Sequence, residues 1–201
     1  MILRTRSKVF EAAIKNESWG DGEPGVLRFP EDDPQAWKII VYYMIHLQVP
    51  SEDFVGEEER DWLGLVNVLD LCWILGDKYD MPQFQDLIML ERLRAITCGS
   101  LLPGMVLRAF EKTPPGSKLR LQAARNAVSG IYHQGNYTLD DFDGLRAFPD
   151  AMTEMMNALQ RYYEEGEQSE DWEEDVSSGN SWKDYMIIGG GPPQHWIRSG
   201  D

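Results

Sequence analysis

Apolar residues along the chain recur mostly at the three- and four-residue spacing of amphipathic helices. The run at residues 62–76 is apolar on nearly every side, which is typical of a helix enclosed by others. Polar residues follow at 77–80, and Pro82 then suits the first turn of a second helix that extends to about Ile96. Because short connections join antiparallel neighbours, this stretch predicts a helical hairpin with a tight corner at residues 77–81.

The second helix of this hairpin is predicted to separate its apolar and polar side chains. Its inward set is Phe84, Leu87, Ile88 and Leu90. Its outward, water-facing set is Gln83, Asp86, Glu91, Arg92 and Arg94.

Upstream, the pattern predicts a helix over residues 2–15, a short strand at residues 26–29 and a helix from Pro34 to about Gln48. Asp33 can cap the unpaired N–H groups of this last helix, and proline is preset for a first helical turn. The buried face of the helix is predicted to consist of Trp37, Ile40, Val41, Met44 and Leu47.

Beyond residue 97 the signals are weaker but remain helical. They predict a helix over residues 103–112, a helix capped by Ser117, a further turn capped by Thr138, and a helix over residues 149–163. Helical spacing favours a core role for the apolar stripe of the last helix, and the alternative is an adaptable methionine-lined surface for a partner. The stripe consists of Met152, Met155, Met156, Leu159 and Tyr163.

The charge of the chain limits the kinds of partner it can bind and bears on whether its C-terminal part is ordered. A formal net charge of −15 argues against direct binding to nucleic acid, whose phosphates require clustered Lys and Arg. Residues 164–175 hold eight of the 34 acidic residues and no basic one. Only short apolar islands occur from Glu164 onward, too few to offset the entropy of ordering, so we expect a disordered tail.

No residue pattern indicates a catalytic or metal site. The three histidines lack the spacing of zinc ligands, and the two cysteines, Cys72 and Cys98, form no disulfide framework, which fits a reduced compartment. The glycines at 189–191 precede two prolines rather than Lys-Ser, so they predict a linker and not a phosphate-binding loop. We therefore expect no enzyme activity, no cofactor and no metal, and no apolar segment is long enough for a membrane span.

One loop carries a candidate interaction residue. Residues 18–21 (SWGD) place Trp19 in a polar, glycine-containing loop, where burial of a large ring is hard to arrange. Exposed tryptophan is enriched at interface anchors, which favours contact with a partner. The alternative is that Trp19 folds back over the neighbouring helices, and both interpretations are kept.

Five segments of the chain form a set: residues 6–10 (RSKVF), 26–34 (VLRFPEDDP), 37–43, 71–82 (LCWILGDKYDMP) and 113–120 (TPPGSKLR). Together they resemble a BTB/POZ domain of the divergent type common in filamentous fungi. The FPEDDP and DKYDMP segments are the more specific pair, and the resemblance covers about residues 2–133. The family normally opens with two strands before the point where this chain begins, so the resemblance implies an N-terminally truncated domain.

The resemblance implies an α+β fold that is predominantly α-helical. We expect a BTB/POZ-like helical cluster with a short residual strand over residues 1–98, a helical extension over 99–163, and the acidic disordered tail over 164–201. A homodimer is left open, because the contact that many members use runs through the N-terminal strand. The expected core is Phe10, Leu27, Trp37, Ile40, Val41, Met44, Leu69, Cys72, Trp73, Leu75, Phe84, Leu87 and Ile88.

The resemblance also implies a non-enzymatic protein–protein interaction module in the cytoplasm, the nucleus or both. Some members bridge a cullin-type ubiquitin ligase scaffold to substrates, so an adaptor is the first expectation. The alternative is a nuclear transcriptional regulator that acts through recruited proteins. Cullin-binding members carry an apolar-x-Glu element after the first helix, to which residues 19–21 are similar. We expect Trp19 to pack in a groove of the partner and Asp21 to pair with a basic residue there.

Overall fold

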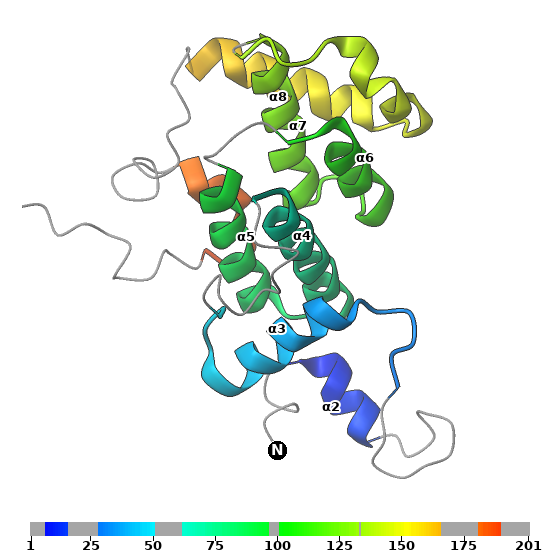
Figure 1. Cartoon of the computed structure of the whole chain (residues 1–201), viewed down its shortest axis with the longest axis vertical. Coiled ribbons are helices and arrows are strands. Elements are labelled where there is room, and N and C mark those ends of the chain that lie inside the picture. Colours follow the sequence, from blue (N-terminus) through cyan, green and yellow to red (C-terminus); the bar gives the residue numbers. More distant parts are fainter. Residues whose placement is uncertain are drawn as a thin grey trace, which may run out of the picture.

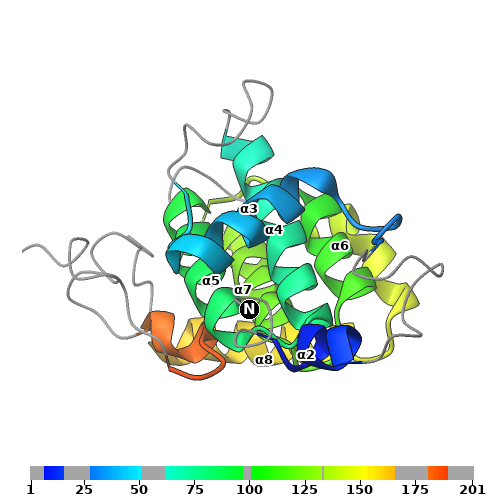
Figure 2. The same ribbon diagram turned by 90° about the horizontal axis from the view of Figure 1, so that it is seen from below.

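The computed structural model describes residues 7–15, 28–50, 62–96, 101–132, 134–165 and 181–189. The elements are α2 (Lys8–Lys15), α3 (Pro34–His46), α4 (Trp62–Lys78), α5 (Pro82–Ile96), α6 (Pro103–Lys112), α7 (Lys118–Tyr132), the 3-10 helix η3 (Leu139–Ala147), α8 (Ala151–Glu165) and the 3-10 helix η4 (Ser181–Tyr185). The α4–α5 pair occupies the middle of the long axis, with α2 and α3 at one end and α6–α8 at the other (Figure 1). Seen from below, α2 and α3 lie across the end of this arrangement (Figure 2).

Helices cover 75% of the described residues, so the prediction of a predominantly α-helical fold is confirmed. The prediction of a short strand is not supported, because the described residues contain none. Arg28 and Phe29 are irregular, and the rest of the predicted strand lies outside the described residues. The Asp32 N–H donates to the Phe29 carbonyl at 3.3 Å, so the chain turns here toward α3 instead of extending.

The predicted corner between α4 and α5 is present and has the geometry of a Schellman motif. The Met81 N–H donates to the Gly76 carbonyl at 2.8 Å, and the Asp80 N–H donates to the Asp77 carbonyl at 3.1 Å. Asp80 takes the left-handed conformation that this motif requires, with φ of 50°. Pro82 then begins α5, as predicted.

α3 begins as predicted and buries a different face from the predicted one. The Asp33 carboxylate accepts from the Gln35 and Ala36 N–H groups, each at 2.9 Å. Ile40 and Met44 are buried as predicted and Trp37 is half-buried, but Val41 and Leu47 are exposed. Placing these two in the core was wrong, because α3 turns another face toward α4. The residues that it buries are Ala36, Ile39, Ile40, Tyr43 and Met44.

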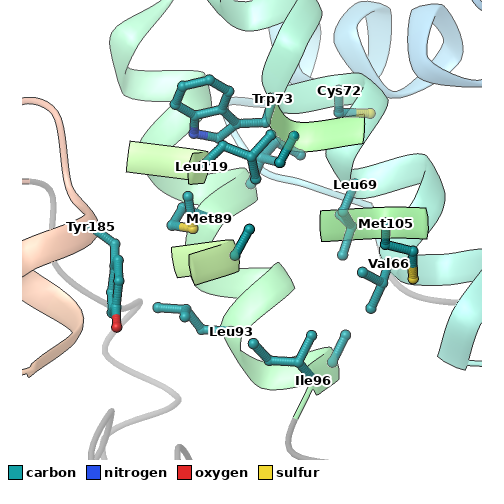
Figure 3. Close-up of a cluster of buried hydrophobic side chains, with 14 of the residues drawn as sticks. Val66, Leu69, Cys72, Trp73, Met89, Leu93, Ile96, Met105, Leu119 and Tyr185 are labelled. Carbon is teal, nitrogen blue, oxygen red and sulfur yellow. The ribbon is translucent and has the colours of Figure 1, made fainter. Parts of the chain in front are cut away.

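Apolar side chains from α2 through η4 form one continuous core. Of the expected core residues, Trp37 and Leu87 are half-buried and Leu27 lies outside the described part of the chain. Figure 3 shows the middle of the core, where Trp73 of α4, Met89 of α5 and Leu119 of α7 lie close together. α4 and α5 therefore supply an apolar layer on which the neighbouring helices pack.

α8 packs against the core with two buried alanines and with two residues of the predicted stripe, Met155 and Leu159, which are half-buried. Its buried apolar residues are Ala151 and Ala158, whereas Met152 is 65% exposed and Met156 and Tyr163 are also exposed. The prediction of a methionine core stripe was therefore wrong for these three residues. α7 buries three alanines of its own, Ala123, Ala124 and Ala127. Small side chains let two helices approach closely, and only the outer part of the stripe is left exposed to solvent.

Residues 181–189 are packed and do not follow the expectation of a disordered tail. η4 lies beside α5 in Figure 1, although α6, α7 and α8 come between these two elements in the sequence. Trp182, Tyr185 and Met186 are buried. The apolar islands of the acidic tail thus include one that belongs to the core.

Candidate protein-interaction surfaces

The two residues predicted to contact a partner, Trp19 and Asp21, lie outside the described residues. α2 precedes their loop and is anchored to the α4–α5 corner. The Ser7 hydroxyl donates to the Tyr79 carbonyl at 2.5 Å and accepts from the Phe10 N–H at 3.2 Å. Phe10 itself is buried. The helix that leads into the candidate loop is therefore fixed at its start.

Four aromatic rings, which we call the aromatic junction, join α2, α3 and the α4–α5 corner. The ring centroids of Phe29 and Trp37 lie 4.6 Å apart, and those of Phe10 and Tyr79 lie 4.8 Å apart. The remaining pairs, between these two stacks, are at 5.4–6.1 Å. Ring pairs at such distances add about 0.5–1.5 kcal/mol each beyond their burial.

Asp32 forms the polar contacts at the edge of the aromatic junction. Its carboxylate accepts from the Lys78 ammonium at 2.7 Å, from the Trp37 indole at 3.1 Å and from the Tyr79 hydroxyl. Asp32 belongs to the FPEDDP segment, and Lys78 and Tyr79 belong to DKYDMP. The two segments that drew attention in the sequence therefore meet in space, where they hold α3 against the hairpin.

Burial and hydrogen bonding shift the pKa values of Asp32 and Tyr79 in opposite directions. Burial alone raises the pKa of Asp32, but the hydrogen bonds from Lys78, Tyr79 and Trp37 outweigh it, and the pKa is lowered from its ordinary value. Burial and the neighbouring Asp32 raise the pKa of Tyr79 well above its ordinary value. A charged Asp32 carboxylate and a neutral Tyr79 phenol are thus the favoured forms.

The outer face of α3 carries an apolar stripe, which we call the α3 stripe. Trp37, Val41 and Ile45 follow one another at a spacing of four residues, so they lie on one side of the helix. Val41 is 45% exposed and Ile45 is 59% exposed. Leu47, the residue that caps the end of the helix, is exposed as well. Scattered exposed apolar residues are ordinary, but a continuous stripe marks a candidate interaction site.

A hollow of about 490 Å³, open to solvent, follows the α3 stripe. Lys38 is the one charged side chain among its described lining residues. The Tyr42 ring lies at its edge against the ring of His46, at a centroid distance of 4.3 Å. The described lining residues are Pro34, Trp37, Lys38, Val41, Tyr42, Ile45 and His46.

The sequence placed Asp86 and Arg92 of α5 on the water-facing side, and the structure buries both. The Arg92 guanidinium forms an ion pair with Asp70 of α4 and donates to the Gln122 side chain of α7. Burial raises the pKa of Asp70, and the positive charge of Arg92 offsets only part of this effect. Both residues have partners from distant parts of the chain, and no local pattern reveals such partners.

The Cys72 thiol lies in surroundings that lower its reactivity. Burial raises the pKa of the Cys72 thiol well above its ordinary value, and the charges of Asp33 and Asp70 raise it further, which makes the thiol a poor nucleophile. Within the described ranges, no three His, Cys, Asp or Glu side chains are grouped to hold a metal ion. No helix of that same part of the chain is long and apolar enough to cross a membrane.

The structure thus offers an apolar helical stripe as its candidate functional surface. The spacing of Trp37 and Val41 gave a signal of this stripe in the sequence, and that signal was attributed to the core. No protein-family model, no curated protein and no solved structure matches this chain.

Proposed function

We propose that the protein is a non-enzymatic protein–protein interaction module, an adaptor with a BTB/POZ-like helical cluster. The observation that carries this proposal is the α3 stripe, an apolar surface with one charged residue along its hollow. The stripe rests on a rigid base, because Asp33 caps α3 and the aromatic junction holds it on the hairpin. A docking surface benefits from such preorganisation, since little order is lost on binding.

The shape of the stripe favours a helix of the partner as its occupant. Side chains at i and i+4 form a ridge, and a second helix can place its own i and i+4 ridge beside it. An acidic residue on that helix would pair with Lys38, which is exposed at the hollow. The proposed partner surface is therefore an amphipathic helix with an acidic residue beside its apolar ridge.

The resemblance of the sequence supplies the partner to test, a cullin-type ubiquitin ligase scaffold. In this proposal Trp19 packs in a groove of the scaffold, Asp21 pairs with a basic residue, and the α3 stripe supports the same contact. The full chain should bind a purified cullin scaffold saturably, as measured by calorimetry.

Two substitutions separate the parts of this interface. Ile45→Asp places a charge in the α3 stripe and should weaken binding by about tenfold or more, equivalent to about 1.4 kcal/mol. Gln83→Asp, an exposed position on α5, makes the same charge change away from the stripe and should leave the affinity unchanged. Trp19→Ala should weaken binding to a similar degree. Circular dichroism checks that each variant is folded.

Three outcomes would contradict parts of the proposal. A chain that does not bind the scaffold is no cullin adaptor. Unchanged affinity in the Trp19→Ala variant would remove Trp19 from the interface, and unchanged affinity in Ile45→Asp would remove the α3 stripe. If light scattering shows a doubled mass that Ile45→Asp abolishes, the occupant of the stripe is a second copy of the chain and not a partner helix.

A further inference from the structure

The packed segment at residues 182–188, which we call the clasp, contacts the rest of the described fold, which we call the body, as a peptide ligand would. Its Tyr185 side chain is fully buried and lies beside Met89 and Leu93 of α5 (Figure 3). Trp182 and Met186 are buried with it. The three large side chains have the i, i+3 and i+4 spacing of one helical face, the spacing by which short helical peptides anchor in a groove.

Charged side chains of the body recognise the acidic and phenolic groups of the clasp. The Arg125 guanidinium donates to the Tyr185 hydroxyl at 2.8 Å and forms an ion pair with the Asp184 carboxylate at 3.1 Å. Arg161 of α8 forms a second ion pair with Asp184 at 3.0 Å. Lys118 of α7 donates to the Asp184 carbonyl at 2.6 Å. Three basic residues from two helices thus converge on one acidic residue of the clasp.

Asp86 recognises the backbone of the clasp. Its two carboxylate oxygens accept from the N–H groups of Ile187 and Ile188, at 2.5 and 3.1 Å. Asp86 is buried on α5, although its neighbours in sequence give no local reason for a buried charge. A carboxylate that accepts hydrogen bonds from two successive N–H groups tolerates any residue except proline at those positions. This contact therefore recognises the backbone and not a particular side chain.

Residues 166–181 separate the clasp from α8 in the sequence, and a chain of this length can reach at most about 50 Å. Ile187 and Ile188 are exposed at the far end of the clasp. A tethered ligand has an effective concentration in the millimolar range, so it occupies its site even when its intrinsic affinity is moderate.

We propose that Asp86, Lys118, Arg125 and Arg161 mark a peptide-docking site that the chain fills with its own clasp. The external ligand of this site is a partner peptide with an acidic residue, a tyrosine and a large apolar residue in succession, followed by two non-proline residues. Such a partner displaces the clasp. The site lies on α5, α7 and α8, away from the α3 stripe, so it is a second interaction surface.

A cleavable full-length chain tests this proposal. A protease recognition sequence is placed within residues 166–180, and the folded protein is cut so that the clasp becomes a separate peptide. Labelled peptides of residues 180–190 are then added, and anisotropy reports their binding to the cut and to the uncut chain. We expect the wild-type peptide to replace the clasp in the cut chain and to bind the uncut chain far more weakly.

Peptide variants identify the contacts. Tyr185→Ala should weaken binding by about tenfold or more, because the buried ring and its bond to Arg125 are lost. Ile188→Pro removes an N–H group that Asp86 accepts from, whereas Ile188→Ala keeps it at an exposed position. Ile188→Pro should therefore bind about tenfold more weakly than Ile188→Ala, which should match the wild-type peptide.

Two results would overturn the proposal. If the cut chain remains folded without its clasp but binds no added peptide, the site has no affinity of its own. If the clasp cannot be exchanged, or the body unfolds when it leaves, residues 182–188 are an ordinary part of the core. Equal binding of Ile188→Pro and Ile188→Ala would exclude the assigned role of Asp86.

Discussion

The aromatic junction and the buried polar contacts of α7 connect helices by different physical means. In the junction, four rings pack together and the polar groups lie at the rim, where Asp32 collects three hydrogen bonds. Around α7, charged and amide side chains are themselves buried, among them Arg120, Gln122 and Arg125. One ring of the junction can be substituted while the others still pack, whereas removing one partner of a buried ion pair leaves the other charge without compensation.

The buried polar contacts form a group that we call the polar layer, made of Asp70, Arg92 and Gln122. Each of these residues has one buried side-chain atom without a hydrogen-bond partner in the described part of the chain, Asp70 Oδ2, Arg92 Nη2 and Gln122 Nε2. Bringing charges out of water is costly, so the layer adds little net stability even though its members are tightly coupled. The junction is stabilised by burial of its rings, and we expect the polar layer to restrict how α4, α5 and α7 meet.

The largest expected effect comes from breaking the polar layer on one side. Arg92→Ala leaves Asp70 buried without its positive partner, which should lower the free energy of unfolding by about 3–5 kcal/mol. Arg94→Ala is the matched control on the same helix, because Arg94 is exposed and pairs with Glu91 at 3.7 Å. Its effect should stay below about 1 kcal/mol. Urea unfolding, followed by circular dichroism, measures both.

A double substitution sharpens this result. Arg92→Met with Asp70→Leu removes both charges and fills the space with apolar side chains, so it should recover most of the stability lost in Arg92→Ala. If Arg92→Ala costs no more than Arg94→Ala, the ion pair contributes nothing and the contrast with the aromatic junction fails.

Phe10→Ala tests the aromatic junction from the side of α2. A buried Phe→Ala change costs about 3–5 kcal/mol in a closed core, and a helix of eight residues is marginal without its tertiary contacts. We therefore expect local release, in which the amide hydrogens of α2 exchange freely while those of α4 and α5 keep their protection. Hydrogen exchange measured by mass spectrometry distinguishes this from global unfolding. Val41→Ala, at an exposed apolar position, should change neither region.

Asp32 should make the aromatic junction sensitive to acid. The pKa of Asp32 is lower in the folded protein than its ordinary value of 3.8, so its stabilising effect is complete above that value and is lost as the pH falls through the folded pKa. Asp32→Asn should cost about 1–2 kcal/mol at neutral pH, and the cost should shrink as the pH falls below 3.8. Glu31→Gln, the exposed neighbour, serves as the control for loss of a negative charge in the same turn. A pH-independent difference between wild type and Asp32→Asn would contradict this assignment.

The sequence predicted the elements of this fold better than their buried faces. Pro34, Pro82 and Pro103 each begin a helix, and α5 and α6 have the predicted bounds. These signals are local, because proline and the residue before it restrict the backbone whatever the rest of the chain does. Ser117 accepts from the Arg120 N–H at 3.2 Å, and Thr138 opens a capping box, again as local signals predicted.

The candidate surfaces could be predicted only in part, because burial is decided between distant segments. Arg92 and Asp86 find their partners on α4, α7 and the clasp, and hydrophobic periodicity counts such residues as exposed. Val41 and Met152 have the opposite problem, since they are apolar residues left on the surface. Both errors arise because contacts with distant segments, and not the local pattern, decide which side of a helix is buried.

The smallest expected effects come from two glycine substitutions, one at Gly76 in the hairpin and one at Gly104 in α6. A Cβ atom at Gly76 would lie 2.7 Å from Gln85 Cγ and 3.2 Å from Phe84 Cδ1, whereas nothing lies within 4 Å of a Cβ atom at Gly104. Alanine gains up to about 1 kcal/mol over glycine within a helix, and crowding of a packed site costs about 1–3 kcal/mol. Gly76→Ala should therefore destabilise the protein by about 1 kcal/mol and Gly104→Ala should stabilise it by about 0.5 kcal/mol, both read from urea midpoints. Because the nearest crowding atom belongs to a flexible side chain, Gly76→Ala combined with Gln85→Ala should cost less than the two single changes together. Additive costs would mean that Gln85 is not the source of the crowding. A Gly76→Ala variant as stable as the wild type would mean that the hairpin has room for a methyl group, and close packing would then no longer distinguish it from α6.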